Sequence, residues 1–377
     1  MKMKYMPMAE YCKEYMRYLG VAKTARRSYA ESVRLLEARG FKDISTFKTL
    51  KPGDKVYRGY LDRTVMAAVI GKKPVAEVGL KVVGGHTDAP RLDLKPKPLY
   101  EKGPYVYFDC HIYGGIKKYQ WLVRPLALYG TIVRKDGSKV NVAVGDDPKD
   151  PVFMISDILP HLGYDQAKKT RDEFFPAEDL DVIAWTTFAK PEKDAKKDAG
   201  PKADKNALVE FLKKTYKVDE EDLLSAELEI VPAGMPREVG FDRALERSSM
   251  LSADVTATAD PHFADQDSTG NGAVFHKGPA ASKYTGGTSK GGSSDCEPEF
   301  VAKIRKIMDD GGVTWQMAEL GKMEKGGGGT IAQYMSRFGM AVLDMGTPLW
   351  NMHAPWERAA KDDCWNTYRA YSAYLRS

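Results

Sequence analysis

The sequence predicts an α/β protein in which a helix-covered central sheet is interrupted by an inserted, β-rich domain. Two observations predict it. Segments with helical and extended patterns alternate in the C-terminal part of the chain, as they do where helices cover a sheet. In the middle of the chain, extended segments follow one another without a helix between them, which is typical of antiparallel sheets. A chain of 377 residues is also long enough for two domains.

The N-terminal part predicts a helix followed by two strands. Residues 1–20 are basic but include Glu10 and Glu14, where a signal peptide needs an unbroken apolar region, so they are expected to form an amphipathic helix. The apolar runs VMAAVI (65–70) and VGLKVVGG (78–85) predict strands, and the second one ends at two glycines.

The middle part predicts the inserted domain. Strands are expected at YVYFDCHIY (105–113), LALYGTIVRK (126–135) and KVNVAVG (139–145), with a hairpin turn at KDGS (135–138). We therefore expect the insertion to cover residues 92–232, which leaves residues 1–91 and 233–377 for the α/β domain.

The C-terminal part alternates between helix and strand. EPEFVAKIRKIMDD predicts a helix that ends at Gly311 and Gly312, and TIAQYMSRF a helix that ends at Gly339. VTWQMAEL and MAVLDMG predict buried strands.

Charge, apolar segments and cysteines argue against a nucleic-acid or membrane partner and bear on the cellular compartment. The net charge is +5, but 57 basic residues are interleaved with 52 acidic ones, so we expect no nucleic-acid partner. No apolar segment approaches the ~20 residues that cross a bilayer, so we expect no membrane partner. The four cysteines lie far apart in the sequence, which favours reduced thiols and a cytoplasmic location.

Polar residues with metal-binding chemistry follow three predicted strands. His86 and Asp88 follow the first, Asp254 the second and His353 the third, and the carboxyl ends of strands are where α/β proteins bind ligands. Histidine and aspartate are ligands that Zn²⁺ accepts when no thiolate is present. The alternatives are a structural histidine and aspartate pair, an aspartate that caps a turn, and a histidine packed between tryptophans.

Two glycine-rich segments predict loops. GKMEKGGGGT (321–330) lacks the residue order of a phosphate-binding loop, so close approach of the backbone to a substrate or metal pocket explains its glycines better. SKYTGGTSKGGSSD (282–295) is either a flexible linker or a loop that contacts substrate.

Seven motifs together resemble bacterial members of the aspartyl aminopeptidase family of dinuclear zinc exopeptidases. They are GGHTDAPRLDLKPKPL, YGGIKKYQWLVRPLAL, GDDPKDPVFMISDILPHL, EIVPAGMPREVGFDR, SKYTGG, AELGKMEKGGGGTIA and NMHAPWE. The resemblance implies a zinc exopeptidase fold interrupted by a dimerisation domain, and a homo-oligomer that ranges from a dimer to a dodecamer. It also implies removal of N-terminal residues from peptide substrates with two zinc ions per chain.

The resemblance assigns roles to the metal-site candidates. His86 and Asp254 resemble the ligands of one zinc, Asp88 resembles the carboxylate that supports His86, and His353 resembles a ligand of the second zinc.

Further residues resemble the substrate and assembly positions of the family. His161 resembles a histidine that reaches the active site of the neighbouring subunit. The resemblance implies that Lys283 and Tyr284 belong to a loop that lines the substrate pocket, and we expect Gly327 and Gly328 of the glycine-rich loop to bind substrate as well.

One segment of the family pattern is missing. In the family, VGFDR is followed by the aspartate that bridges both zinc ions and by a Glu-Glu pair that supplies the general base, whereas here Arg243 is followed by Asp254 without that segment. The adjacent Glu220 and Glu221 lie in the inserted domain and are interpreted as a helix cap. One zinc ion or none is therefore expected.

The missing segment leaves three hypotheses for the function. The chain is a zinc-dependent aminopeptidase, a non-catalytic oligomeric homologue that keeps the assembly surface, or a shortened version of an active protein. If it is active, Glu319 and Glu324 are the first candidates to replace the missing carboxylates.

Overall fold

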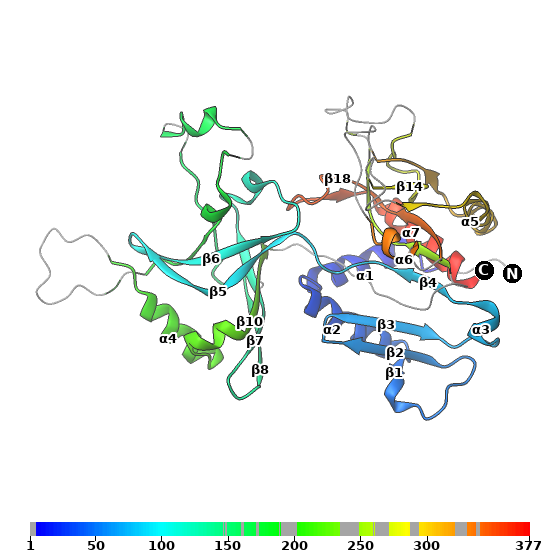
Figure 1. Ribbon diagram of the computed structural model, residues 1–377, viewed down its shortest axis with the longest axis horizontal. Helices are drawn as coiled ribbons and strands as arrows, with labels where there is room; N and C mark the ends of the chain where they lie inside the picture. The colour runs from blue at the N-terminus through cyan, green and yellow to red at the C-terminus, as the bar shows by residue number, and fades with distance from the viewer. Residues whose placement is uncertain are drawn as a thin grey trace, which may run out of the picture. The chain divides into compact units, whose positions relative to one another are not determined.

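The computed structural model divides the chain into two compact units (Figure 1). The α/β unit comprises Met1–Asp88, Pro236–Met352 and Trp356–Ser377, and the inserted unit comprises Ala89–Met235 and His353–Pro355. The structure describes residues 5–145, 147, 149–159, 162–170, 173–187, 189, 202–233, 249–258, 260, 271–286, 294–320, 330–336 and 340–377. The catalytic and dimerisation roles expected for the two parts of the chain stay predictions.

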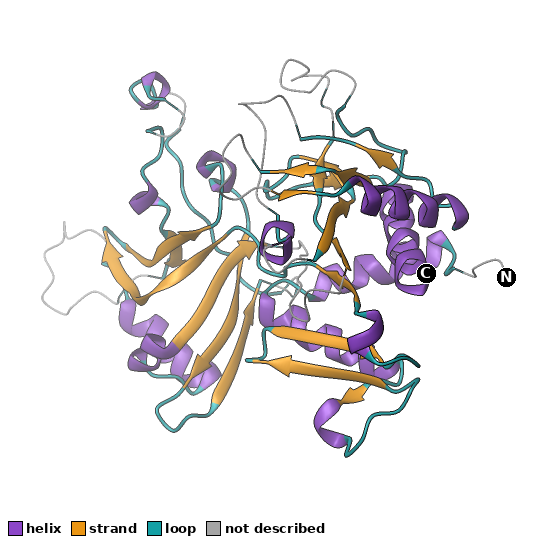
Figure 2. Ribbon diagram, turned by 45° about the vertical axis from the view of Figure 1, so that its right-hand side comes forward, coloured by secondary structure: helices purple, strands orange, loops and turns teal. Residues whose placement is uncertain are grey.

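The α/β unit is built on a mixed five-stranded sheet with the strand order β16-β13-β17-β11-β4. Figure 2 distinguishes the helices, strands and loops of the chain by colour. β4, β11 and β17 run parallel, and β13 runs antiparallel to β17. The strands are β4 Lys81–Gly84, β11 Ser249–Ser252, β13 Ala280–Ser282, β16 Gln316–Met317 and β17 Ala341–Gly346.

Helices cover both faces of this sheet. Leu251 of β11 packs in a cluster with α5 (Pro298–Asp310) and α7 (Lys361–Arg376), whereas its neighbour Met250 packs in another cluster with α6 (Ala332–Ser336). Adjacent residues of a strand face opposite sides, so both sides of the sheet are buried under helices. This arrangement confirms the predicted helix-covered α/β sheet.

The N-terminal part of the α/β unit forms helices and a separate small sheet. The predicted amphipathic helix is confirmed as α1 (Met8–Val21), and α2 (Ala25–Ala38) follows it, with the Thr24 side chain accepting a hydrogen bond from the backbone of Arg27. The sheet contains β1 Lys42–Asp43, β2 Lys55–Tyr60 and β3 Thr64–Val69.

Two strands are shorter than the sequence predicts. The strand expected at residues 78–85 is β4 alone, because Val75–Val78 forms the short helix α3 before it. The strand expected at VTWQMAEL is reduced to β16. The remaining short strands are β12 Thr256–Ala257, β14 Tyr284–Thr285, β15 Ser294–Asp295, β18 Pro348–Trp350 and β19 Arg358–Ala359.

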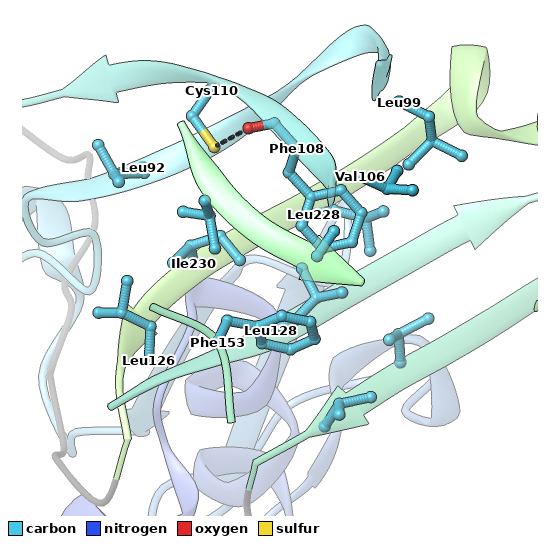
Figure 3. Close-up of a cluster of buried hydrophobic side chains, with 14 of the residues drawn as sticks. Leu92, Leu99, Val106, Phe108, Cys110, Leu126, Leu128, Phe153, Leu228 and Ile230 are labelled. Carbon is cyan, nitrogen blue, oxygen red and sulfur yellow. Dashed lines mark hydrogen bonds between the residues drawn. The ribbon is translucent and has the colours of Figure 1, made fainter. Parts of the chain in front are cut away.

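The inserted unit contains a six-stranded antiparallel sheet with the order β8-β7-β10-β5-β6-β9. Its hydrophobic core includes side chains from all these strands and from α4 (Lys205–Tyr216), and Figure 3 shows part of it. The predicted turn at KDGS joins β7 to β8. The strands are β5 Arg91–Lys102, β6 Tyr105–Tyr113, β7 Leu126–Val133, β8 Lys139–Val144, β9 Val182–Trp185 and β10 Ala226–Pro232.

The adjacent glutamates of the inserted unit lie at the start of a short helix. Glu220 and Glu221 begin the 3₁₀ helix Glu220–Ser225, and Asp219 and Asp222 exchange hydrogen bonds at its start as a capping box. The predicted helix start is therefore present, but Asp219 and Asp222 form the cap, and Glu220 and Glu221 occupy the first turn beside it. In the part of the chain that the structure describes, no helix is long and apolar enough to cross a membrane.

Candidate active site

His86 lies two residues beyond the end of β4, and Asp88 holds its ring. The ring Nδ1 atom is 3.0 Å from the backbone oxygen of Asp88 and 3.2 Å from its Oδ1 atom. Because a carbonyl oxygen can only accept a hydrogen bond, Nδ1 carries a proton and donates the hydrogen bond to Asp88. This arrangement leaves the Nε2 atom as the metal-binding atom of the ring.

Asp254 lies two residues beyond the end of the neighbouring strand. β4 and β11 run parallel with Gly84 opposite Ser252, so His86 and Asp254 follow their strands at the same level. The backbone N–H of Val255 donates to the Oδ1 atom of Asp254 at 2.9 Å. The other carboxylate oxygen, Oδ2, is 3.9 Å from the Nε2 atom of His86.

The two carboxylates change the acid–base behaviour of His86. The hydrogen bond to Asp88 raises the pKa of the imidazole to about 9, assisted by the negative charge of Asp254 and opposed by burial. Without a metal ion, the ring is therefore an imidazolium paired with two carboxylates at neutral pH. A metal ion that binds at Nε2 displaces a proton.

His86 and Asp254 have the chemistry of two zinc ligands. Tetrahedral zinc, with bonds of about 2.0–2.2 Å, places two ligand atoms roughly 3.3–3.5 Å apart. The Nε2 atom of His86 and the Oδ2 atom of Asp254 are 3.9 Å apart, so they would move a few tenths of an ångström closer to share one ion. Within the described residues, however, no three His, Cys, Asp or Glu side chains come close enough together to hold an ion.

A third carboxylate, that of Asp344, is buried and close enough to Asp254 to feel its charge, and it is not among the site residues predicted from the sequence. Asp344 of β17 accepts a hydrogen bond from the hydroxyl of Ser252 at 2.5 Å. Burial, together with the charge of Asp254, raises the pKa of Asp344 to about 7. The signal was present in MAVLDMG, where one acidic residue interrupts an otherwise apolar strand.

Lys283 and Tyr284 form a cluster of their own. The Lys283 ammonium donates to Asp295 at 2.6 Å and to the Tyr284 hydroxyl at 2.9 Å. β13 is antiparallel to β17 and its last residue, Ser282, is opposite Asp344, so the chain at Lys283 continues in the direction opposite to that of the chain at Asp254. Burial raises the pKa of the nearby Glu319, against hydrogen bonds from the backbone of Tyr284 and Lys283.

His353 groups with the inserted unit, and its relation to His86 stays a prediction. Its backbone has a left-handed φ of 64°, which is uncommon for a residue with a side chain and is frequent at functional sites. Four other predicted residues lie outside the described part of the chain: His161, Glu324, Gly327 and Gly328.

Comparison with known proteins decides the family. The sequence profile described as Aminopeptidase I zinc metalloprotease (M18) matches residues 18–246 and 241–375. The chain belongs to the M18 family. This result confirms the family predicted from the motifs and, with the fold, the predicted zinc exopeptidase architecture.

The M18 relatives match along nearly the whole chain. The probable M18 family aminopeptidase 1 of Clostridium acetobutylicum is 36% identical over 442 aligned positions, which cover 96% of this chain and 94% of that protein. The crystal structure of the M18 family aminopeptidase from Thermotoga maritima has a TM-score of 0.87 at 32% identity, covering 98% of this chain and 96% of that one. The S. cerevisiae mApe1 dodecamer shares the fold, with a TM-score of 0.70 at 16% identity over 97% of this chain and 96% of that one.

The same comparisons bear on the missing segment. An alignment of 442 positions is longer than this chain of 377 residues, so the Clostridium relative carries residues inside the aligned span that have no counterpart here. The M18 profile matches in two stretches that meet at residues 241–246. This is the junction after Arg243 where the motifs predict that the segment is absent.

Proposed function

We propose that this M18 chain is a zinc-dependent aminopeptidase that removes N-terminal residues from peptides, with one zinc ion held by His86 and Asp254. The observation that carries the proposal is the 3.9 Å approach of the His86 Nε2 atom to the Asp254 Oδ2 atom at the ends of adjacent parallel strands. The names of relatives at 32% to 36% identity support an aminopeptidase and do not favour the non-catalytic alternative.

Each residue of the site has a defined task in this proposal. Asp88 accepts a hydrogen bond from the Nδ1–H group of His86 and so orients the ring, and the backbone N–H of Val255 fixes the carboxylate of Asp254 by donating to its Oδ1 atom. Bound zinc supplies Lewis-acid chemistry for the hydrolysis of a peptide bond.

The number of zinc ions follows from the ligands that the chain retains. The bridging aspartate and the Glu-Glu pair are missing from the junction between Arg243 and Asp254. His353 is then the single retained ligand of a second ion, and a catalytic zinc normally has three protein ligands. We therefore propose no more than one ion per chain.

The substrate and assembly roles are proposals of the same kind. We assign Lys283, Tyr284, Gly327 and Gly328 to the substrate side, and His161 to contact with a neighbouring subunit, because the motifs that contain them match the family.

We propose a homo-oligomer assembled through the inserted unit, in the range from a dimer to a dodecamer. The support is a group of exposed apolar side chains in that unit, which a monomer would leave in water. The group consists of Val152, Ile158, Leu159, Leu162 and Tyr164.

We propose a cytoplasmic location for the protein. No disulfide links the four cysteines, all of which the structure describes, and this is the state expected in a reducing compartment.

The test of the proposed function is a metal-dependent activity assay. The purified chain is stripped with a chelator, reloaded with Zn²⁺ or Co²⁺, and assayed on a panel of aminoacyl chromogenic substrates beside His86→Ala and Asp254→Asn. We expect activity that requires metal and that both variants lose. Metal-dependent hydrolysis that persists in both variants would place the active site elsewhere. If the chain hydrolyses none of the substrates, the hypothesis of a non-catalytic homologue is favoured instead.

A further inference from the structure

The buried carboxylate of Asp344 connects three elements of the α/β unit. It lies in β17, accepts the hydroxyl of Ser252 from β11 at 2.5 Å, and is hydrogen bonded to the side chain of Thr330. The Thr330 hydroxyl also accepts a hydrogen bond from the backbone of Ala332 at the start of α6. One carboxylate therefore ties the end of β11 to the first turn of a covering helix.

The register of the strands relates this network to the proposed zinc ligand. β11 and β17 run parallel, with Ser252 opposite Asp344. Ser252 is the last residue of β11 and precedes Asp254 by only two positions, so the place of Asp254 depends on where this strand end is held. The hydrogen bond from Ser252 to Asp344 thus fixes the strand end from which Asp254 projects.

We propose that Asp344 is a positioning residue for the metal site: through Ser252 it holds Asp254 at the separation from His86 that one zinc ion can join. The inference rests on the proposed function, since it concerns how the same site is held in place. An acidic side chain within a buried apolar strand is costly unless it is hydrogen bonded. The hydroxyls of Ser252 and Thr330 satisfy Asp344, and the first of them belongs to the last residue of β11.

A purely structural role is the competing explanation, and the chain offers a matched control for it. Asp363 is another fully buried aspartate of the α/β unit. It accepts backbone N–H groups of His276 at 2.9 Å and Gly278 at 2.7 Å, and its hydrogen bonds involve neither β11 nor Asp254. Asp363→Asn should therefore affect folding stability without affecting metal affinity.

The experiment measures the dissociation constant of Zn²⁺ by competition with a chromophoric chelator, together with the melting temperature of the metal-free protein. The proteins are the unchanged full chain, Asp344→Ala, Asp344→Asn, Ser252→Ala, Asp363→Asn and His86→Ala. Residues that orient metal ligands typically contribute about 10- to 100-fold to metal affinity. We expect Asp344→Ala and Ser252→Ala to weaken Zn²⁺ binding by about tenfold.

The other variants show whether a loss of Zn²⁺ affinity comes from a misplaced ligand, from the loss of a charge or from a less stable fold. Asparagine can still accept the Ser252 hydroxyl, so Asp344→Asn should bind Zn²⁺ nearly as well as the unchanged chain. Equal weakening by Asp344→Asn and Asp344→Ala would assign the effect to charge and overturn the inference. Unchanged Zn²⁺ affinity in Asp344→Ala and Ser252→Ala, with only a lower melting temperature as in Asp363→Asn, would also overturn it.

The same measurement distinguishes a wrong zinc site from a wrong positioning role. If the unchanged chain binds Zn²⁺ no better than His86→Ala, the zinc site itself is wrong, and the positioning role of Asp344 is wrong with it. If the unchanged chain binds Zn²⁺ through His86 while the Asp344 variants bind equally well, only the positioning role is wrong.

Discussion

Gly346 lies directly against the backbone of Asp254: a Cβ atom at position 346 would be 1.5 Å from the Asp254 carbonyl oxygen. Real Cβ atoms never approach a backbone atom so closely, so any side chain here forces β17 and the segment after β11 apart. Glycine at this position is therefore a requirement for the place of Asp254 beside His86.

The first prediction is that Gly346→Ala impairs both folding and metal binding. Moving the backbone of Asp254 changes its separation from His86, so we expect a lower melting temperature and at least tenfold weaker Zn²⁺ binding, comparable to the loss of a group that orients a ligand. The control is Gly20→Ala in α1, where an added Cβ meets no atom within 4 Å. It should leave Zn²⁺ affinity unchanged and raise stability by about 0.5–1 kcal/mol. Unaltered Zn²⁺ affinity in Gly346→Ala would show that Asp254 is not a ligand.

The second prediction concerns the carboxylate that holds the His86 ring. Asp88→Ala removes the side-chain acceptor at 3.2 Å, although the backbone acceptor at 3.0 Å remains. We therefore expect Zn²⁺ binding to weaken by about tenfold, toward the lower end of the usual effect of such partners. Isothermal titration calorimetry of the chelator-treated protein measures this change. Asp88→Asn, which keeps an acceptor oxygen, should lose less affinity than Asp88→Ala, and the reverse order would contradict the orienting role.

The third prediction is a pH dependence of stability that arises from Asp344. Its pKa is raised from 3.8 to about 7 in the folded protein, so its contribution to stability is fully present below pH 3.8 and is lost as the pH rises through 7. Asparagine does not titrate, so the stability of Asp344→Asn should not fall in this way as the pH rises. Between pH 5 and pH 8, the free energy of unfolding of the variant relative to the unchanged chain should rise by on the order of 1–3 kcal/mol.

Urea unfolding in the presence of a chelator measures this difference at both pH values. The chelator keeps metal binding from contributing to the result. Asp363→Asn, measured at the same pH values, shows how another buried carboxylate of the unit behaves. A difference between Asp344→Asn and the unchanged chain that stays constant with pH would mean that Asp344 titrates in its ordinary range.

The fourth prediction concerns the rate of hydrolysis. Because the Glu-Glu pair that supplies the general base is missing, we expect turnover about 10²- to 10⁴-fold below that of the Clostridium relative. Metal analysis of the reloaded protein should give no more than one zinc ion per chain. Turnover equal to that of the relative would require a replacement base. Glu319 is then the first residue to test as Glu319→Gln, because it is a partly buried carboxylate hydrogen bonded to the backbone of Lys283 and Tyr284.

The fifth prediction concerns assembly. Leu162 and Tyr164 of the inserted unit are 66% and 73% exposed, and we expect a second copy of the chain to cover them. Light scattering should give a mass that is a multiple of 41.9 kDa for the unchanged chain and a smaller mass for Leu162→Asp. Met16→Lys, which changes an exposed residue of α1 in the other unit, is the control and should not alter the mass. A 41.9 kDa species for the unchanged chain at micromolar concentration would contradict the proposed assembly.

Local sequence patterns predicted much of the architecture. The alternation of helical and extended segments gave the helix-covered sheet, because periodicity of apolar residues reports which face of an element is buried. Extended runs joined by a turn at KDGS gave the antiparallel sheet of the insertion. The boundaries were less accurate at residues 78–85, where a short helix precedes β4, because tertiary packing rather than local preference decides where a short strand begins.

The sequence by itself also determined the family and the candidate metal ligands, since motif order and residue type are local properties of the chain. Only the tertiary structure decided that β4 and β11 are parallel neighbours in a register that brings His86 to 3.9 Å from Asp254. It also decided that Asp344 is buried against Ser252. Register between strands far apart in the sequence depends on how whole faces pack, and a shift of one residue would turn these side chains to the opposite side of the sheet.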